Sequence, residues 1–509
     1  MSSPDRAPLA NPRFWLVAGL LLLPFMITNQ SLWIDEGNTA LYAIQPDLPA
    51  WWHRLREDPA ADSQMPFSLF VVWLNGWVWG TREWQMRAVN LLWGGLALWG
   101  MFRVGRRLRL PWLPLLLAIQ PYFWFYTDEA RPYALQIACG AWLLLALVEF
   151  YATEAAGETW AWLFAGAGYF LFLSTMLALV PLAAIAGAGG VAAWKARWKP
   201  SRKALLILLG GALASIPTAG YYCSTLLRGA KGAQLWQVDL KFFVYVLYEY
   251  SGIASLGPPT EEIRALARSA HILHTLAAHW YQFVLPILGF ALLLVVMISG
   301  WRRRPAGISS ATGVGLALVL GMDALIFITA SLVLQKAFWA RHLAPVFPFY
   351  VTLLGLALAG ARALHRPVMR WTPVLVCSLL VLSALNLRLS PAWRKEDYRS
   401  AAHVARQALA ENKSVWWVAA ENCATYYHLE YTFGQMEPGK ICLQLDLTKN
   451  LPAPDMIIYS RPDLNVRDAA VEGLIERNNY QVAARFKSFV IWVKPGESPE
   501  PHSRAGPGA

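Results

Sequence analysis

Long apolar segments separated by short clusters of Arg and Lys dominate the first 390 residues of the chain. Phe14–Thr28, Met86–Phe102 and Val314–Leu334 are examples, and only 15% of all residues are charged. An ordinary soluble domain carries about 25% charged residues. Because a segment this apolar can satisfy its backbone inside a bilayer only as a helix or a closed barrel, the repeated runs predict an α-helical polytopic membrane protein.

The Arg and Lys clusters fit one topology. Those within 103–109, 195–203, 302–304 and 362–370 share one side of the membrane if the chain crosses it about 11 times, up to about 13. Cytoplasmic loops carry such an excess of Arg and Lys, so we expect a cytoplasmic N-terminus and an extracytoplasmic C-terminus. The clusters also contain much of the net charge of +12, where it sets orientation, and we expect no nucleic-acid binding.

The composition divides the chain into three parts. Residues 1–390 form the predicted membrane domain, with outer-face loops at 29–85 and 223–279. Residues 391–495 resemble a small soluble α/β domain on the outer face, because helical and strand-like periodicities alternate there. The Pro-, Gly- and Ser-rich tail 496–509 is expected to be disordered. Expected helices are Tyr398–Asn412 and Val466–Arg477; expected strands are Val415–Ala420, Met456–Ser460 and Phe489–Lys494.

Several segments of the membrane domain depart from a simple span. Trp51–Asp58 has the pattern of an amphipathic interfacial helix, and Pro66–Gly80 is too short to cross. Trp160–Trp194 is too long for one span, so we expect two short ones. Pro111–Phe125 is interpreted as one outward span, and Phe242–Tyr250 as a helix that dips into the membrane.

The five cysteines show no spacing typical of a metal or redox site. Cys423 and Cys442 share the soluble region and could form a disulfide or remain free thiols. Three histidines of the outer loop, His271, His274 and His279, could share one helix face, but solvated neutral imidazoles are a simpler interpretation than a metal site.

Two acidic pairs lie at the ends of apolar segments. Asp35-Glu36 follows the first apolar run, and Asp128-Glu129 precedes Arg131 and Tyr133. Uncompensated carboxylates near a hydrocarbon core cost several kcal/mol, so such pairs indicate a functional site. The predicted topology places both pairs on the outer side.

Each of these residues also has a purely structural interpretation. Asp35-Glu36 could stabilise a helix N-terminus, and Asp128-Glu129 could form a salt bridge with Arg131. Arg131 and Arg341 could anchor spans at the interface. We favour a catalytic role for Asp35-Glu36, hold the two interpretations of Asp128-Glu129 as equal, and favour phosphate binding by the two arginines.

The arrangement of motifs resembles the GT-C superfamily of membrane glycosyltransferases, and most closely its bacterial family 39 branch, which includes protein O-mannosyltransferases and lipid A aminoarabinose transferases. The matching features are Leu32-Trp33-Ile34-Asp35-Glu36; Pro66–Gly80 followed by Glu83-Trp84-Gln85-Met86-Arg87 and Gly105-Arg106-Arg107; Tyr126-Thr127-Asp128-Glu129-Ala130-Arg131-Pro132-Tyr133; Arg341-His342-Leu343-Ala344-Pro345; and Asp397-Tyr398-Arg399-Ser400-Ala401-Ala402.

The resemblance implies a hexosyl- or pentosyltransferase of the bacterial cytoplasmic (inner) membrane. Such an enzyme transfers a sugar, with inversion, from a polyprenyl-phosphate donor to a lipid, protein or polysaccharide acceptor at the outer face. By the same resemblance, Asp35 is the carboxylate that accepts the acceptor's proton and Glu36 is its partner. Asp128 or Glu129 is the second acid.

The resemblance also implies that Arg131 and Arg341 bind the carrier phosphate, with Tyr133 and His342 beside them. No cofactor is certain. Many relatives carry His-Pro-Pro where this chain has Gln64-Met65-Pro66, and a His where it has Ser174-Thr175-Met176. The sequence therefore leaves the metal requirement unknown, and a divalent ion stays one possibility.

The chemistry of these residue types agrees with that assignment. A hydroxyl is a weak nucleophile, so an inverting transfer needs one base, and a carboxylate in a partly dry site suits that task. A guanidinium can bind the departing phosphate in two places. The alternative from another class is a transporter or flippase of lipid-linked saccharides, and a third interpretation makes the outer domain a partner-binding module.

Overall fold

The computed structural model describes residues 11–58, 61–152, 157–195, 200–228, 238–259, 261–263, 279–302, 310–362, 367–445, 453–461 and 469–496. The chain forms two compact units. We call Met1–Thr28 with Gln45–Trp393 the helical unit, and Asn29–Ile44 with Arg394–Ala509 the α/β unit. Each is described by itself.

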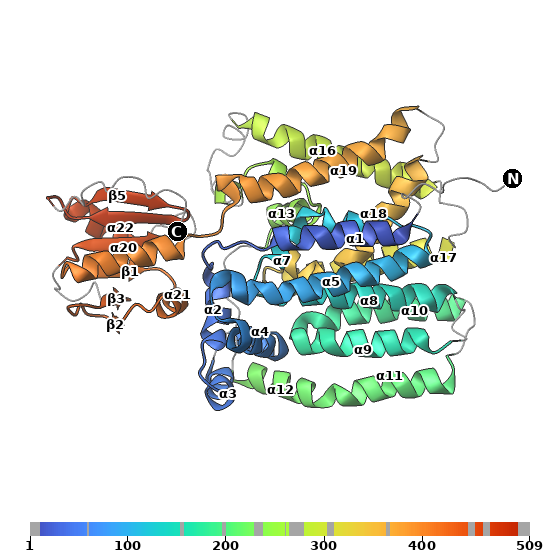
Figure 1. The fold of residues 1–509 in the computed structure, drawn as a ribbon, viewed down its shortest axis with the longest axis horizontal. Helices are drawn as coiled ribbons and strands as arrows, with labels where there is room; N and C mark the ends of the chain where they lie inside the picture. Colours follow the sequence, from blue (N-terminus) through green and yellow to red (C-terminus); the bar gives the residue numbers. More distant parts are fainter. Residues whose placement is uncertain are drawn as a thin grey trace. The chain divides into compact units, whose positions relative to one another are not determined.

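The helical unit is a bundle of helices that run side by side (Figure 1). Its elements are α1 (Pro12–Leu22), η2 (Leu23–Met26), α3 (Leu48–Glu57), η3 (Ala61–Gln64), α4 (Pro66–Trp79), α5 (Glu83–Arg107), α6 (Leu113–Ala118), α7 (Pro121–Thr127), α8 (Tyr133–Ala152), α9 (Thr159–Ser174), η4 (Met176–Ala178), α10 (Leu179–Lys195), α11 (Arg202–Ala214), α12 (Ile216–Leu227), α13 (Leu240–Tyr250), η5 (Ala254–Leu256), α16 (Trp280–Arg302), α17 (Ser310–Leu334), η6 (Ala340–Val346), α18 (Phe347–Arg362), α19 (Pro367–Leu389) and η7 (Pro391–Trp393).

Seven helical segments of the described residues are long and apolar enough to cross a membrane, and three further apolar helices are shorter. The predicted helical membrane fold is therefore confirmed. Helix α8 forms the centre, because 89% of its most apolar window is buried, against 11% in the segment Arg202–Leu227. Apolar side chains on the exposed face of α11, such as Leu206 and Leu209, are suited to contact lipid.

The backbones of the central elements approach closely. Helix α8 packs against α5, α9 and η6. A methyl group added at Gly140 would collide with the Pro345 carbonyl, and one added at Gly100 would press on Ala141. Small residues at these positions therefore let α8 and its neighbours pack at short distance, as membrane helices commonly do.

Two predicted spans have different outcomes. Trp160–Trp194 is broken as expected, into α9 and α10 with η4 between them. The single span predicted for Pro111–Phe125 is wrong, because the structure has two short helices, α6 and α7. Helix α7 begins at Pro121, whose ring fixes the local backbone and which has no N–H to continue the preceding helix.

The α/β unit contains a six-stranded sheet in the order β2-β3-β1-β4-β6-β5. Strands β2, β3, β1 and β4 are parallel, and β6 and β5 run antiparallel to their neighbours. Its elements are α2 (Ile34–Ala43), α20 (Tyr398–Ala410), β1 (Val415–Val418), α21 (Glu421–Tyr426), β2 (Tyr431–Phe433), β3 (Ile441–Leu443), β4 (Met456–Ser460), α22 (Ala469–Arg477), β5 (Gln481–Phe486) and β6 (Phe489–Val493).

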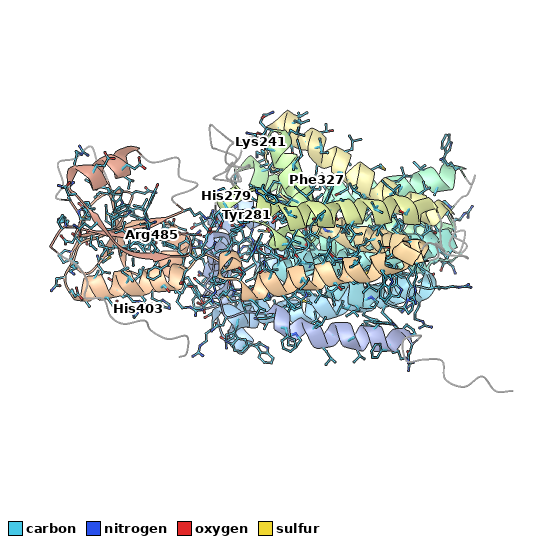
Figure 2. The ribbon with its side chains drawn as sticks, turned by 90° about the horizontal axis from the view of Figure 1, so that it is seen from above. Lys241, His279, Tyr281, Phe327, His403 and Arg485 are labelled. Carbon is cyan, nitrogen blue, oxygen red and sulfur yellow. The ribbon has the colours of Figure 1, made fainter. Side chains whose placement is uncertain are left out.

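Helices cover both faces of this sheet. Trp417, Ile458 and Phe489 point into one apolar core with residues of α20 and α21. Trp416 and Ile457 point into the other core, which includes Val471 of α22. In Figure 2, His403 marks α20 and Arg485 marks β5. The burial of both faces explains the nearly continuous apolar run of β4, Met456–Ser460, which is buried throughout.

The predicted small α/β fold is confirmed, with strands at Val415, Met456 and Phe489 as expected. Strands β2, β3 and β5 were not predicted. Cys423 and Cys442 are free thiols, which decides between the two states left open above. His271 and His274 lie outside the described residues, so their grouping with His279 stays untested.

Candidate active site

The acidic pair Asp35-Glu36 occupies the first turn of α2, in the α/β unit. Helix α2 packs against α21, where a methyl group at Gly37 would press on the sulfur of Cys423. Asn422 donates a hydrogen bond to Asn38 across the same contact. The α/β unit therefore fixes the orientation of this acidic turn.

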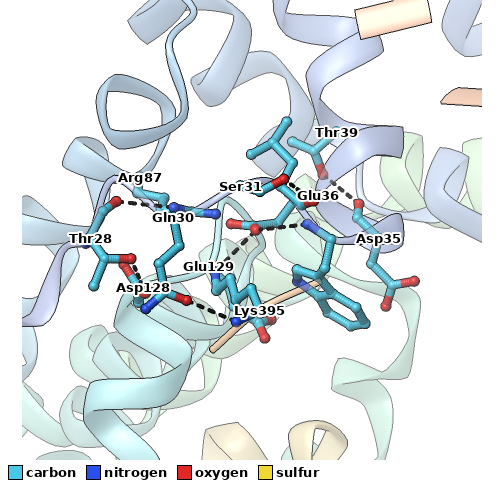
Figure 3. Close-up of polar contacts among 12 residues, drawn as sticks. Thr28, Gln30, Ser31, Asp35, Glu36, Thr39, Arg87, Asp128, Glu129 and Lys395 are labelled. Carbon is cyan, nitrogen blue, oxygen red and sulfur yellow. Dashed lines mark hydrogen bonds and ion pairs between the residues drawn. The ribbon is translucent and has the colours of Figure 1, made fainter. Parts of the chain in front are cut away.

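Glu36 is completely buried and paired with a cation. Its Oε2 atom lies 3.0 Å from Nζ of Lys395, whose side chain is only 9% exposed. The backbone N–H of Trp33 also points to this oxygen at 3.5 Å, as in a helix cap. The Lys395 backbone N–H in turn donates to Gln30 at 2.8 Å (Figure 3). Glu36 thus has the structural environment that the helix-cap interpretation requires.

Asp35 has a different environment. Its side chain is half-buried and points away from the Glu36 carboxylate (Figure 3). Burial lowers the pKa of Arg461, but nearby carboxylates raise it above the usual value. Glu396 makes the larger contribution and Asp35 a smaller one. Glu396 itself accepts a hydrogen bond from Nε of Arg461. A positive charge near a carboxylate favours its ionised form, which is the form that can accept a proton.

Cys423 packs against this acidic turn, and its thiol is expected to be unreactive. Burial, and then the nearby carboxylates Glu396 and Glu36, raise the pKa of its thiol well above the usual value. Because the thiolate is the reactive form, we expect no nucleophilic role for this residue.

Replacing Lys395 by Met is expected to lower the free energy of unfolding by about 2–3 kcal/mol, because it leaves the Glu36 carboxylate buried without its charge-assisted hydrogen bond. Thermal or chemical unfolding of the purified protein measures this loss. The matched control is the double variant Lys395→Met/Glu36→Gln, which removes both charges and should recover part of the stability. Equal losses in the single and double variants would contradict the pairing.

The second acidic pair lies in the helical unit, and its first member binds three donors. Asp128 accepts hydrogen bonds from the backbone N–H and hydroxyl of Thr28, at 2.6 and 2.8 Å (Figure 3). Nη1 of Arg388 lies 2.9 Å from Oδ2 of Asp128, the oxygen that also accepts the hydrogen bond of the Thr28 hydroxyl. Asp128 is 1% exposed. This carboxylate therefore joins the end of the first helix to the end of α19.

Two further polar side chains, Arg87 and Asn90, complete this buried group. Arg388 also donates to the carbonyls of Met26 and Trp124. Arg87 of α5, which is fully buried, donates to the Thr28 carbonyl at 3.0 Å. Asn90, one turn further along α5, donates to two carbonyls of the loop that contains the acidic pair. We call Thr28, Arg87, Asn90, Asp128 and Arg388 the Asp128 network.

Glu129, unlike Asp128, lies near aromatic side chains. Its carboxylate lies near the phenols of Tyr122 and Tyr126 and contributes to raising the pKa of Tyr126, for which burial is the largest cause. The ring of Tyr126 packs edge-on against Tyr133, with centroids 4.9 Å apart. Of the two acids, Glu129 is thus the one that faces the aromatic side chains next to the predicted carrier-binding residues.

Arg131 has a protein partner. Its Nη1 atom lies 2.6 Å from Oδ1 of Asp62, and both side chains are more than 90% buried. Next to Asp62, the Ser63 carbonyl accepts a hydrogen bond of 2.7 Å from Tyr221 of α12. Arg131 therefore closes a buried ion pair with the loop around η3, which differs from the acidic partner considered in the sequence.

Arg341 and His342 lie in the first turn of η6. Burial raises the pKa of Glu249, and Arg341 opposes part of this rise. The His342 ring packs edge-on against Phe338 and lies 6.5 Å from Phe327 of α17, which is labelled in Figure 2. Its Nδ1 atom is 3.1 Å from the Trp339 carbonyl. His342 is thus oriented by the backbone.

Sequence reasoning missed the charged residues that pair with the predicted site residues. Lys395 and Arg461 belong to a region that seemed poor in motifs, and Asp62, the partner of Arg131, belongs to a mixed loop. Arg388 had a usable signal, because an arginine at the border of an apolar run is costly unless it has a partner. Glu249, within an aromatic run, had the same signal.

Among the described residues, no group of three or more His, Cys, Asp or Glu side chains is arranged to hold a metal ion. The carboxylates of Asp128 and Glu129 are the predicted candidates. Asp128 already accepts hydrogen bonds from three donors. The identity of any metal stays open.

No protein-family model matches the chain, and no curated protein matches it. Among solved structures, ArnT from Cupriavidus metallidurans in the apo state is similar, with a TM-score of 0.57 and 13% identity over 94% of this chain and 97% of that one. The same protein bound to undecaprenyl phosphate gives a TM-score of 0.52 and 14% identity over 96% and 99%.

Mycobacterial arabinofuranosyltransferase AftD gives a TM-score of 0.48 at 13% identity, over 95% of this chain and 40% of that one. The two ArnT structures show that the chain has an ArnT-like fold, in agreement with the predicted helical membrane fold. Among particular proteins, the chain is similar to ArnT over nearly its whole length. At this level of identity the similarity concerns the fold.

Proposed function

We propose that this protein is a glycosyltransferase that moves a sugar from a polyprenyl-phosphate donor to an acceptor at the outer face of the bacterial inner membrane, with inversion. One observation carries the proposal. The chain shares the ArnT fold over 96% of its length with a structure that contains undecaprenyl phosphate. Hexose or pentose, and lipid, protein or polysaccharide acceptor, are finer choices that donor and acceptor panels can distinguish.

Asp35 is the proposed base. As the acceptor hydroxyl attacks the anomeric carbon, its proton passes to the Asp35 carboxylate, while the sugar–oxygen bond breaks toward the carrier phosphate. Arg461 near Asp35 supports the ionised starting form. Glu36, held by Lys395, keeps the turn in place. Glu36 is fully buried in this pair, and the proposal assigns the proton transfer to Asp35.

Arg341 is the proposed principal ligand of the carrier phosphate, with Tyr133 and His342 beside it. A guanidinium can make two parallel hydrogen bonds to phosphate oxygens. We assign Arg131 a supporting role, because its guanidinium is held by Asp62. Glu129 is the proposed second acid, which orients the acceptor or holds a divalent ion.

A flippase for lipid-linked saccharides is the second candidate, and one observation favours it. Asp323 lies in the middle of α17 and is 1% exposed. Neither of its carboxylate oxygens has a hydrogen-bond partner in the described part of the chain. An ionisable side chain inside a span is typical of a transport path.

The two candidates separate in one experiment. The protein in nanodiscs receives a panel of radiolabelled polyprenyl-phosphate sugars and a crude envelope acceptor fraction, and the protein in liposomes receives the same lipids in one leaflet. Label in the acceptor fraction supports the transferase. Movement of the lipid between leaflets without such label would overturn it in favour of the flippase.

A further inference from the structure

A basic cavity lies at the C-terminal end of α5. Its volume is about 470 Å³, and it is lined by Trp99, Phe102, Arg103, Arg106 and Arg107. Because these positions repeat at intervals of three or four residues, they form one face of the helix. Met101 and Val104, on another face of the same turns, are fully buried. The last turns of α5 therefore bury one face in the bundle and line a cavity with the other.

Helix α8 shows how deep this cavity lies. It runs beside α5 and is long and apolar enough to span a membrane (Figure 1). Nε of Arg107 lies 2.6 Å from Oε1 of Glu149, in the last turn of α8. The ring of Trp99 packs edge-on against Trp142, about two turns earlier in α8, with centroids 5.6 Å apart. The arginines therefore lie at the border of the span, and the aromatic side chains extend from them toward the hydrocarbon core.

The opposite end of α5 belongs to the Asp128 network. At about 1.5 Å per residue, the helix advances about 28 Å from Arg87 to Arg106, close to the thickness of about 30 Å of a hydrocarbon core. The cavity and the Asp128 network therefore lie at opposite borders of the membrane. Because the proposed function has the acidic motifs at the outer face, it puts the cavity in the cytoplasmic leaflet.

The cavity has more positive than negative charge. Arg107 is balanced by Glu149, but Arg103 and Arg106 have no acidic partner among the described residues. The guanidinium of Arg106 lies over the ring of Phe102, with its central carbon 5.8 Å from the ring centroid. Two guanidinium groups are thus left to bind an anion, and one of them is already oriented by an aromatic ring.

Two simpler explanations account for the arginines alone. Cations in the last turn of a helix balance its dipole, and arginines at a membrane border set the orientation of the chain. Neither requires that the arginines share one face with Phe102 and the half-exposed Trp99, around a cavity. A ligand with an anionic head and apolar chains accounts for the charge, the aromatic side chains and the cavity together.

We propose that this cavity is a binding site for an anionic phospholipid of the surrounding bilayer. The headgroup phosphate accepts charge-assisted hydrogen bonds from Arg103 and Arg106, and the acyl chains lie along Phe102 and Trp99. Basic pockets at the cytoplasmic ends of membrane helices are suited to such headgroups. The site is separate from the proposed carrier site, and the inference does not depend on the transfer reaction.

The test measures lipid binding to the whole protein by native mass spectrometry from a neutral detergent. The protein is titrated with dioleoylphosphatidylglycerol, and separately with dioleoylphosphatidylcholine, which has the same chains and no net charge. We expect the Kd for phosphatidylglycerol to be at least about tenfold lower, from two arginines near one phosphate. This preference should shrink as the salt concentration rises.

A pair of double variants locates the site. Arg103→Gln/Arg106→Gln should weaken binding of phosphatidylglycerol about tenfold or more and leave phosphatidylcholine unaffected. Arg202→Gln/Lys203→Gln is the matched control, because it removes the same charge at the start of α11, outside the cavity. Lys203 lies 3.8 Å from Glu158, which precedes α9, so the control is at the same end of the bundle. All four replaced side chains are exposed, so both variants should fold.

Each outcome decides one part of the inference. Equal affinity of the wild type for the two lipids would overturn the site. Equal weakening in both double variants would overturn its location, because net charge alone would then explain the preference. Displacement of the lipid by an equal concentration of soluble glycerol 3-phosphate would show a site for small anions and overturn the commitment to a lipid. Because binding is measured without a sugar donor, failure of the transfer reaction would leave this inference standing.

Discussion

Replacing Asp35 by Asn is expected to reduce the rate of sugar transfer at least about a hundredfold, the effect typical of losing a general base. The amide has nearly the same shape but cannot accept the proton of the acceptor hydroxyl. The α/β unit holds the turn through Gly37 and Glu36, so the fold should survive the change. Transfer of label from the preferred donor, with the protein in nanodiscs, measures the rate.

The competing interpretation gives Asp35 only a favourable charge at the N-terminus of α2. In that case Asp35→Asn would cost about 0.3–1 kcal/mol of stability and leave transfer intact. Glu421 offers a matched control, because it is an acid in the first turn of another helix of the same unit. Glu421→Gln should retain full activity. If Asp35→Asn behaves like Glu421→Gln, Asp35 is not the base.

Glu36→Gln distinguishes the two members of the pair. Glu36 is bound to Lys395, so its neutralisation should act mainly on stability. Loss of activity in Glu36→Gln with full activity in Asp35→Asn would exchange the two proposed roles. Comparing both variants at equal folded fraction therefore assigns the base within the turn.

The helical architecture could be predicted from the sequence because burial in a bilayer imposes a long apolar run on each span. That rule says little about where a run is interrupted. Pro111–Phe125 is apolar throughout, yet the chain breaks before Pro121, where backbone geometry overrides composition. Strands β2 and β3 were missed for a related reason, because three residues are too few to show a period.

The acids of the candidate site could be found from the sequence because each stands beside an apolar run. Which cation pairs with which acid could not be predicted, because the partners lie far apart along the chain. Arg388 pairs with Asp128 across 260 residues, and Lys395 with Glu36 across 359. Such pairings depend on the tertiary fold and leave no local pattern.

These long-range pairs change the meaning of the two acidic motifs. In each motif one carboxylate is buried against a cation, Glu36 against Lys395 and Asp128 against Arg388. Its neighbour, Asp35 or Glu129, points elsewhere. The buried ion pairs give Glu36 and Asp128 a structural role, and the proposal assigns the chemical roles to Asp35 and Glu129.

Asp128→Leu is the variant for which we expect the largest loss of stability, about 3–5 kcal/mol, the cost of removing one partner from a buried ion pair. The change leaves the Arg388 guanidinium without its counter-charge and the Thr28 N–H and hydroxyl without their acceptor. Unfolding by SDS in mixed micelles, followed by tryptophan fluorescence, measures the free energy.

Two further variants test whether this loss comes from the Asp128 network. The double variant Asp128→Leu/Arg388→Leu removes both charges, and should be more stable than the sum of the single losses predicts. Glu57→Gln breaks the exposed pair with His53 in the same unit and should cost less than about 1 kcal/mol. If Asp128→Leu is as mild as Glu57→Gln, the network does not hold the first and last helices together. Asp128 would then return to the list of catalytic candidates beside Glu129.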